Sequence, residues 1–387
     1  ILTKKTIKVI GSGPTGSLLA LSLASELCNV VLIEPLSDSD LLAKDKGYAV
    51  TQCTRNIFQE LGIWSDLEKS AHGFTSLSII DDVLSQSVLV NKSDLKIINK
   101  DQTNIGWVIE HKDLMQLLIN NINNNQYIKK FNYDSTSDKN FDFVLAADGR
   151  ESSARKIWEV KYFKSFYKQK CVSFKAIING LPNKRAYEIF RSEGPLALLP
   201  LSENVYQVIW FSSESATKSK LKLSKAKLLE KLRKDLPNNI KPEAIINNIS
   251  SFSVAKAFAL INFSKYTNIL VGDSAHSFHP VGGQGLNSCI RDVYELSTLI
   301  KSFDNLSIIN RKFFSLKYFL NRSFDIISLI IFTDFLIRFF SNKFILFYPL
   351  RYLIFYTLKK FKFVRINIFS VMTDSIKKYK FSMQKMD

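Results

Sequence analysis

The chain has 387 residues, of which 46% are hydrophobic and 23% charged, a balance that excludes disorder or collagen-like order for most of its length. At this length we expect two or three structural units with a sizeable core. The 53 Lys and Arg against 35 Asp and Glu give a net charge of +18, which favours an anionic partner: a nucleic acid, an acidic membrane face or a phosphorylated ligand. Lys, Asn and Ile are all abundant, so biased base composition of the gene is a second source of this excess.

The four cysteines form no CxxC pair, so the sequence predicts neither a zinc site nor a disulfide framework. No apolar run precedes a small-residue cleavage site near the first residue, so we expect no signal peptide. These observations predict a cytoplasmic protein with reduced thiols.

The first 34 residues predict a βαβ unit. Residues 7–10 form an apolar run, residues 17–26 have helical apolar spacing, and residues 29–33 form a second apolar run that ends at Glu34. Between the first strand and the helix stand Gly11, Gly13 and Gly16 in the GxGxxG spacing. Such a turn admits a pyrophosphate at the helix N-terminus, and a carboxylate at position 34 suits an unphosphorylated ribose, as in FAD or NAD.

The middle of the chain predicts further strands separated by helices and loops. We expect a strand at 107–109 with a helix from about 113, a polar loop over 120–140, and a buried strand at 141–147. Residues 172–211 alternate as strands do, residues 217–236 predict one exposed amphipathic helix, and residues 268–272 predict another buried strand before a Gly-rich loop and a helix from 287.

The last 87 residues differ in composition. They carry 16 Lys and Arg against 5 Asp, and 21 of the 48 aromatic residues. The longest apolar stretch, 326–340, is interrupted by Asp334 and Arg338, so no segment reaches the length that an uncharged spanning helix needs.

The glycine turn at 11–16 and two later segments together resemble a known superfamily. The run from Val271 to Asn287, with the letters VGDSAHSFHPVGGQGLN, resembles the second FAD-binding motif of the flavin-dependent aromatic hydroxylases, and Asp148-Gly149 resembles their middle motif. Within that superfamily the sequence resembles the ubiquinone-biosynthesis (UbiH-like) hydroxylases over nearly its whole length. The segments that carry this second resemblance are 106–114, 186–190, 194–201, 333–342 and 349–351.

The resemblance implies an α/β fold like that of p-hydroxybenzoate hydroxylase. A Rossmann-like FAD-binding domain would contain an inserted, mostly antiparallel β-sheet substrate domain, with a helical C-terminus. The implied ranges are 1–75, 105–160 and 265–305 for the FAD-binding domain, 76–104 and 161–264 for the substrate domain, and 306–387 for a C-terminal helical, membrane-contacting region.

The resemblance also implies the site residues. Gly11, Gly13 and Gly16 would hold the FAD pyrophosphate, Glu34 the ribose and Asp273 the ribityl chain, while Pro280, Gly283 and Gly285 would lie along the isoalloxazine ring. The remaining residues expected to bind the cofactor are Lys46, Lys112, Asp148, Gly149, Gly272, Leu286 and Asn287. Tyr187, Leu198 and Trp210 are our candidates for the pocket wall. Family members usually have Arg where this chain has Lys46 and Lys112, and Lys lacks the bidentate fork of Arg.

The activity implied is hydroxylation of an aromatic ring, of a polyprenylated phenol or quinone precursor, by NAD(P)H and O2 through a flavin C4a-hydroperoxide. No protein nucleophile is required. The alternatives are an FAD-dependent isoprenoid reductase or epoxidase, and a non-catalytic FAD-binding subunit of a quinone-biosynthesis complex. We expect no metal site, although His276 and His279 have HxxH spacing, because no third ligand is placed to complete one.

We expect no nucleic-acid partner, since the charge excess lies in an aromatic tail. Instead, the tail is expected to rest on the cytoplasmic membrane face, which would make the protein peripheral. Its apolar contacts would be Phe332, Phe335, Phe339, Phe340, Phe347 and Tyr348, and its cations Lys343, Arg351, Lys359, Lys360, Lys362 and Arg365. The alternative is that these aromatic residues pack inside the protein.

Overall fold

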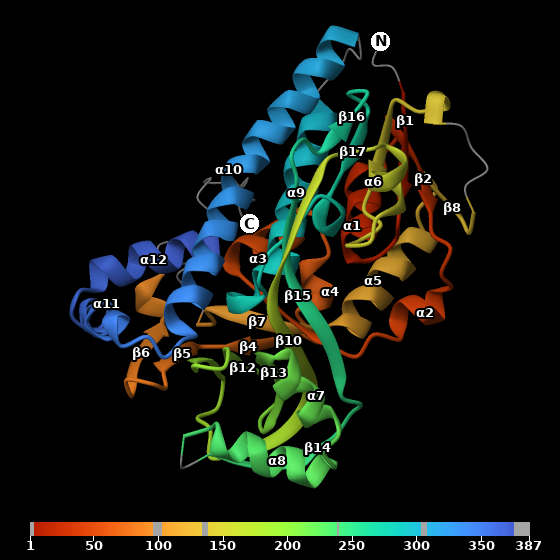
Figure 1. Ribbon diagram of the computed structural model, residues 1–387. Helices are drawn as coiled ribbons and strands as arrows, with labels where there is room; N and C mark the ends of the chain where they lie inside the picture. The colour runs from red at the N-terminus through yellow and green to blue at the C-terminus, as the bar shows by residue number, and fades with distance from the viewer. Residues whose placement is uncertain (1–3, 96–102, 134–137, 238–239, 303–307, 375–387) are drawn as a thin grey trace.

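The structure is a computed structural model that describes residues 4–95, 103–133, 138–237, 240–302 and 308–374. The strands of this part of the chain form three sheets, and a group of C-terminal helices lies along one flank of the molecule (Figure 1). The expected fold class, an α/β protein with a largely antiparallel second sheet and a helical C-terminus, is confirmed.

The first sheet has the strand order β16-β17-β9-β1-β2-β8, and all neighbours except β16 and β17 pair in parallel. Its strands are β1 (Lys5–Ile10), β2 (Cys28–Ile33), β8 (Ile128–Phe131), β9 (Phe143–Ala146), β16 (Phe263–Ser264) and β17 (Asn268–Leu270). Helix α1 (Pro14–Leu23) packs between α5 (His111–Asn123) and α9 (Gln284–Ser302). Apolar side chains of these strands and helices form the largest core cluster.

The second sheet follows the order β18-β15-β10-β13-β12-β11-β5-β6, with β14 paired to β10. Its strands are β5 (Ser76–Asp81), β6 (Gln86–Asn91), β10 (Tyr162–Asn179), β11 (Arg185–Phe190), β12 (Leu196–Pro200), β13 (Val205–Ser213), β14 (Lys241–Ile245), β15 (Ser250–Ala259) and β18 (His276–Ser277). Only β11 and β5 pair in parallel among its described neighbours. A small third sheet consists of β3 (Gly47–Val50), β7 (Gly106–Glu110) and β4 (His72–Phe74).

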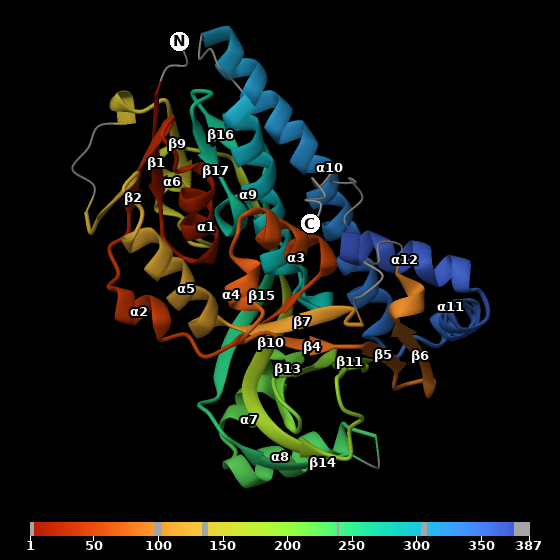
Figure 2. The ribbon, with the colours of Figure 1, turned by 180° about the vertical axis from the view of Figure 1, so that it is seen from behind.

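Short helices connect these sheets, and long ones close the chain. The connecting helices are α2 (Asp38–Leu42), α3 (Gln52–Glu60), α4 (Trp64–Leu67), α6 (Ser153–Ile157), α7 (Glu214–Leu221) and α8 (Lys225–Lys234). The C-terminal helices are α10 (Ile308–Phe340), α11 (Tyr348–Lys360) and α12 (Lys362–Asp374). Seen from behind, α11 lies beside β6, and α12 lies beside α3 (Figure 2). No helix of the described residues is both long and apolar enough to cross a membrane.

Two expected elements differ from the structure. The polar segment 120–140 is not all loop, because α5 continues to Asn123 and β8 adds an edge strand to the parallel sheet, with Ile128 buried beside Val30. The single helix expected over 217–236 is two helices, and Lys220 is buried with its Nζ 3.7 Å from the centre of the Trp210 ring. Neighbouring structure thus overrides the local polarity of both segments.

The tail also differs from its expected surface. Phe339 and Phe340 are buried in a cluster with β6 and α12, so these two rings pack inside the protein. Arg351 is fully buried and paired with Asp81 of β5, while Arg365 binds Asp94 at 2.7 Å. Residues 306, 307 and 375–387 of the expected C-terminal region lie outside the described residues.

Candidate functional site

The glycine turn between β1 and α1 has the geometry of a ligand cradle. Gly11 has φ +92°, and a Cβ there would lie 2.6 Å from the Ala147 carbonyl oxygen at the end of β9. A Cβ on Gly16 would lie 1.8 Å from the Gly11 carbonyl oxygen. At Gly13, by contrast, a Cβ would meet nothing within 4 Å. Gly11 and Gly16 therefore let the turn close, and Gly13 leaves open space at the N-terminus of α1.

Glu34 supports this turn from the end of β2. Its carboxylate is 5% exposed and accepts hydrogen bonds from the backbone N–H of Ser12 at 2.6 Å and of Leu36 at 3.0 Å. The carboxylate therefore fixes the turn directly, and a contact with a ribose stays a prediction.

Asp148 and Gly149 follow β9, at the same edge of the parallel sheet. Gly149 has φ +81°, and Asp148 Oδ2 accepts a hydrogen bond from the Ala154 N–H at 3.0 Å. Asp148 Oδ1 and the nearby Ser12 Oγ are buried, and neither has a hydrogen-bond partner among the described residues. Buried polar atoms normally find partners, so these atoms and the open space at Gly13 fit a polar ligand such as the FAD pyrophosphate.

Gly272 and Asp273 follow β17 at the same sheet edge. Gly272 has φ +66° and donates its N–H to Asp292 at 2.9 Å, which fixes the loop on α9. Asp273 is partly exposed, with Arg150 Nε 3.4 Å from its carboxylate. Its predicted role toward the ribityl chain needs such a solvent-accessible carboxylate.

Lys46 and Lys112, which stand where the resemblance implies arginines, lie in different surroundings. Lys46 keeps contact with solvent, yet desolvation by the protein atoms around it lowers its pKa to about 8. The nearby carboxylate of Asp273 acts in the opposite direction and raises this pKa. Lys112 is exposed on the first turn of α5. Its neighbour His111 is buried, and the His111 ring is hydrogen-bonded to the Tyr48 hydroxyl and to the Leu41 carbonyl. The FAD contact of Lys112 stays a prediction that no described contact supports.

The second Gly-rich segment bends over the end of β3. Gly282 and Gly283 have φ of +70° and +65°, and a Cβ on Gly283 would lie 2.9 Å from that of Ala49. Asn287 holds the segment by donating to the carbonyls of Ala49 and Gly283, both at 2.8 Å. The side chain of Asn287 therefore positions the loop. Leu286 packs against the main core, and Gly285 borders open space.

The two histidines of the HxxH segment have separate partners. His276 pairs with Asp292 at 2.6 Å, and His279 packs against the rings of Phe211 and Tyr167. His279 Nδ1 accepts the Val281 N–H, and burial lowers the pKa of His279 to about 3. No group of three His, Cys, Asp or Glu side chains within the described ranges could hold a metal ion.

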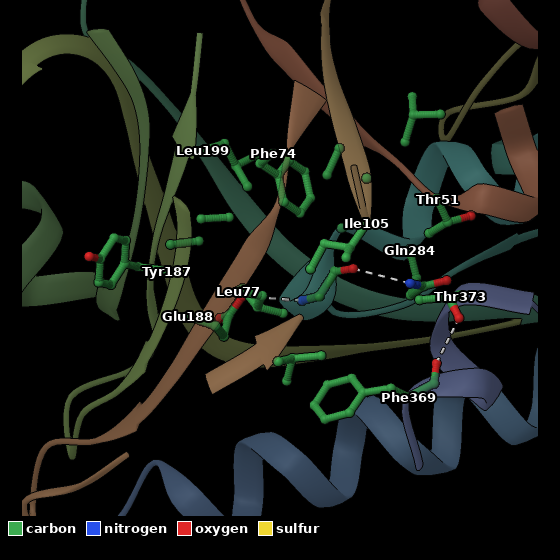
Figure 3. A pocket seen from close by; sticks show the side chains of 18 of the residues that line it. Thr51, Phe74, Leu77, Ile105, Tyr187, Glu188, Leu199, Gln284, Phe369 and Thr373 are labelled. Carbon is green, nitrogen blue, oxygen red and sulfur yellow. Dashed lines mark hydrogen bonds between the residues drawn. The ribbon is translucent and has the colours of Figure 1, made fainter. Parts of the chain in front are cut away.

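An apolar cavity lies between the Gly-rich segment and the second sheet (Figure 3). Pro280, Gly282 and Gly283 border it on one side, and β11, β12 and β13 border it on another. The C-terminal helix α12 closes part of the wall with Phe369 and Thr373. The cavity is therefore lined by three parts of the chain: the segment predicted to bind flavin, the predicted substrate domain and the C-terminal tail.

The expected pocket wall is partly wrong. Tyr187 borders the cavity from β11, but its ring packs with Leu198 and Trp210 in the core on the other face of the sheet. The residues that border the cavity on those strands are their neighbours, because successive side chains of a strand point to opposite faces. These neighbours are Ala197, Leu199, Ile209 and Phe211.

Glu188 is the functional candidate that the sequence did not reveal. It borders the cavity from β11, and burial raises its pKa to about 7. Its Oε2 faces the Gly282 N–H at 3.4 Å, and its Oε1 is buried with no hydrogen-bond partner among the described residues. In the sequence, the sign that could have pointed to Glu188 is an acidic residue in a strand that is otherwise mostly apolar.

Comparison with known proteins agrees with this geometry. The family described as FAD binding domain matches residues 4–303. The uncharacterized protein slr1300 of Synechocystis is 28% identical over 317 residues, which are 76% of this chain and 74% of that protein. The 3-demethoxyubiquinol 3-hydroxylase of Escherichia coli is 23% identical over 74% of this chain and 77% of its own length.

A solved structure shares the fold. The p-nitrophenol 4-monooxygenase PnpA from Pseudomonas putida matches with a TM-score of 0.75 at 16% identity, over 96% of this chain and 99% of PnpA. The family match covers well over half of the chain and includes the glycine turn, Asp148 and the second Gly-rich segment. The chain therefore belongs to the FAD binding domain family, and it is an FAD-dependent monooxygenase similar to the ubiquinone-biosynthesis hydroxylases.

Proposed function

We propose that the protein hydroxylates the aromatic ring of a polyprenylated phenol or quinone precursor, with NAD(P)H as reductant and O2 as oxidant. The observation that carries this proposal is the apolar cavity beside the Gly-rich segment, with a single carboxylate among its described lining residues. Such a cavity suits a ring with an apolar substituent. The similarity to a hydroxylase that is named for a ubiquinol supports the same substrate class.

The residues of the chain have separable roles in this proposal. The N-terminus of α1, opened at Gly13, would bind the pyrophosphate, and Asp273 would bind the ribityl chain. Pro280 and Gly283 would lie beside the flavin ring, which, when FAD is bound, supplies electron transfer and the activation of O2. The apolar wall would exclude water from the reacting atoms and hold the substrate ring in place.

We also infer that the substrate arrives from a lipid surface to which the tail binds. Large apolar side chains are exposed around the start of α11 and the junction of α11 with α12, at the flank shown in Figures 1 and 2. They are Phe344, Ile345, Leu346, Leu350, Leu353, Phe361 and Phe363. The exposed cations Lys343, Lys359, Lys360 and Lys362 accompany them. This group of residues, which we name the tail surface, would attach the protein to an anionic membrane face.

Turnover with isotopic oxygen tests the proposed reaction. The protein loaded with FAD should oxidise NAD(P)H slowly alone and faster with a prenylated phenol. The product hydroxyl should carry oxygen-18 when the gas is labelled. Label that arrives from water instead would overturn the monooxygenase reaction, and equal NAD(P)H oxidation with and without every prenylated phenol would overturn the substrate class.

A further inference from the structure

Glu188 stands out within the cavity because its neighbours give it no partner of opposite charge. Beside it, β12 contributes Ala197 and β5 contributes Ile79. The Gly-rich segment contributes the backbone N–H of Gly282, 3.4 Å away, and Gln284. Among the described lining residues, the only other one with a titratable side chain is Tyr187, whose ring lies on the opposite face of β11.

A carboxylate in this position lowers the stability of the fold. Burial of an ion without a partner is unfavourable, and an unpaired buried oxygen adds to this cost. Glu188 Oε1 is such an oxygen, and Figure 3 shows the Glu188 carboxylate reaching from β11 toward the Gly-rich segment. A group that destabilises the free protein while bordering a cavity suits interaction with a bound ligand.

We propose, resting on the proposed function above, that Glu188 is a catalytic residue: its carboxylate accepts a hydrogen bond from the hydroxyl of the bound phenol and takes the proton of that hydroxyl during hydroxylation. The unpaired Oε1 is the acceptor. The substrate therefore needs a free hydroxyl on its ring. A methyl ether of the same size would leave the carboxylate unpaired.

The proton transfer balances within the cavity. The O–H bond of the phenol breaks, its electron pair stays on the phenolic oxygen and enriches the ring, and the proton forms a new bond to Glu188 Oε1. The negative charge moves from the carboxylate to the ring oxygen, so the total charge in the cavity is unchanged. When the hydroxylated ring becomes aromatic again, the original oxygen regains a proton from Glu188, and the hydroxylated carbon releases its hydrogen as a proton to solvent. The oxidant is O2 activated by the reduced flavin: one oxygen atom would form the new C–O bond, the other would leave as water, and NAD(P)H would supply the two electrons.

The turnover rate should depend on pH because only the ionised form of Glu188 can accept the proton. Glu188 must be a carboxylate to receive the proton, and burial holds its pKa at about 7. The rate with a phenol should therefore rise from pH 6 to pH 8. Tyr187 does not contribute in this range, because burial raises its pKa further above its ordinary value of 10.

Binding and turnover of two probes by the FAD-loaded protein test the proposal. The probes are 2-geranylphenol and its methyl ether, and the variants are Glu188→Gln and Glu203→Gln. Gln keeps an acceptor for the Gly282 N–H, and Glu203 is an exposed carboxylate in the turn before β13. Flavin absorbance after gel filtration shows that each variant is folded and loaded.

We expect the wild-type protein and Glu203→Gln to bind the phenol roughly tenfold to a hundredfold more tightly than the ether, as hydrogen bonds to charged groups do. Glu188→Gln should lose most of this difference, and its turnover should lose the rise between pH 6 and pH 8. Unchanged discrimination and an unchanged pH profile in Glu188→Gln would overturn the role of Glu188 while leaving the proposed function intact. Failure of the wild-type protein to bind or hydroxylate either probe would overturn both.

Discussion

Gly13 and Gly16 lie on the same turn, but a methyl group would meet different surroundings at the two positions. At Gly16 it would overlap the Gly11 carbonyl oxygen, whereas at Gly13 it would enter open space. Gly16 is therefore needed by the fold, and Gly13 is expected to be needed by the ligand.

This difference predicts opposite outcomes for two alanine variants. Gly16→Ala should destabilise the flavin-free protein by about 3 kcal/mol, because backbone must move to relieve the overlap. Gly13→Ala should change the free energy of unfolding by only about 0.5 kcal/mol or less but reduce the flavin retained after gel filtration. Urea unfolding of both flavin-free variants measures the first effect. Equal stability of the two variants would contradict this assignment.

Glu188 makes the stability of the protein depend on pH. The folded protein favours the protonated carboxyl, with a pKa of about 7 against an ordinary value of 4.5, so its contribution to stability is lost as pH rises through 7. Glu188→Gln should therefore be more stable than the wild-type protein at pH 8, by up to about 3 kcal/mol, and close to it at pH 4.5. Thermal unfolding at the two pH values, with Glu203→Gln as control, measures this difference. A constant offset between the proteins at both pH values would contradict the buried, unpaired carboxylate.

The residues that could be predicted from the sequence are those whose role depends on local backbone. Gly11 and Gly16 occupy positions where the turn itself admits no side chain, and the spacing of the motif reveals this. The surroundings of Glu188 could not be predicted, because β5, β12 and the Gly-rich segment meet around it only in the folded protein. Leu198 and Trp210 were assigned to the wrong face, because the apolar strands gave no sign of which side faces the cavity.

At the scale of elements, a buried ion pair fixes α11 to the second sheet. Arg351 and Asp81 are both fully buried, and Arg351 Nε donates to Asp81 Oδ2 at 2.8 Å. Removal of one partner of such a pair leaves a buried charge without compensation. The C-terminal helices are therefore expected to depend on this contact for their attachment.

Arg351→Met should destabilise the protein by about 3–5 kcal/mol. Hydrogen exchange should also increase first in α11 and α12. Lys360→Met, on the same helix but exposed, should change stability by less than about 0.5 kcal/mol. Combining Arg351→Met with Asp81→Asn should cost less than the sum of the two single changes, since no unpaired charge then remains. Additive effects would show that the two side chains do not act as a pair.

Elements that depend on distant partners were the ones mispredicted. Strand β8 is short and carries Lys129 and Lys130, and it exists because β2 offers an open edge beside Ile128. The local sequence around Lys220 predicts a solvent-exposed side chain, yet α7 places its ammonium over the Trp210 ring. Burial there lowers the pKa of Lys220 to about 7. By contrast, β1, α1 and β2 follow their own apolar patterns and lie close to where the sequence predicts them.

At the scale of the whole molecule, the described cations of the tail fall into two groups. Some tail cations pair internally, as Arg351 does with Asp81 and Arg365 with Asp94. Others remain exposed beside apolar side chains on the tail surface. The tail surface includes Phe363 of α12, the helix whose Phe369 and Thr373 border the cavity, and we propose that a ligand dissolved in lipid reaches the site along this helix.

Sedimentation with vesicles tests whether the tail surface binds lipid. The four lysines of the tail surface would each contribute roughly 1 kcal/mol near an anionic membrane, and this contribution weakens with salt. The full chain should sediment with anionic vesicles at low salt and less at high salt.

Ile345→Glu with Leu346→Glu should abolish binding without unfolding the protein, because both side chains are more than 70% exposed (73% and 77%). Leu260→Glu with Ile261→Glu, exposed on the turn after β15, is the matched control and should bind as the wild-type protein does. Binding that ignores salt and survives the double change at 345 and 346 would contradict attachment through the tail surface and would leave the internal packing of Phe339 and Phe340 as the use of the tail aromatics.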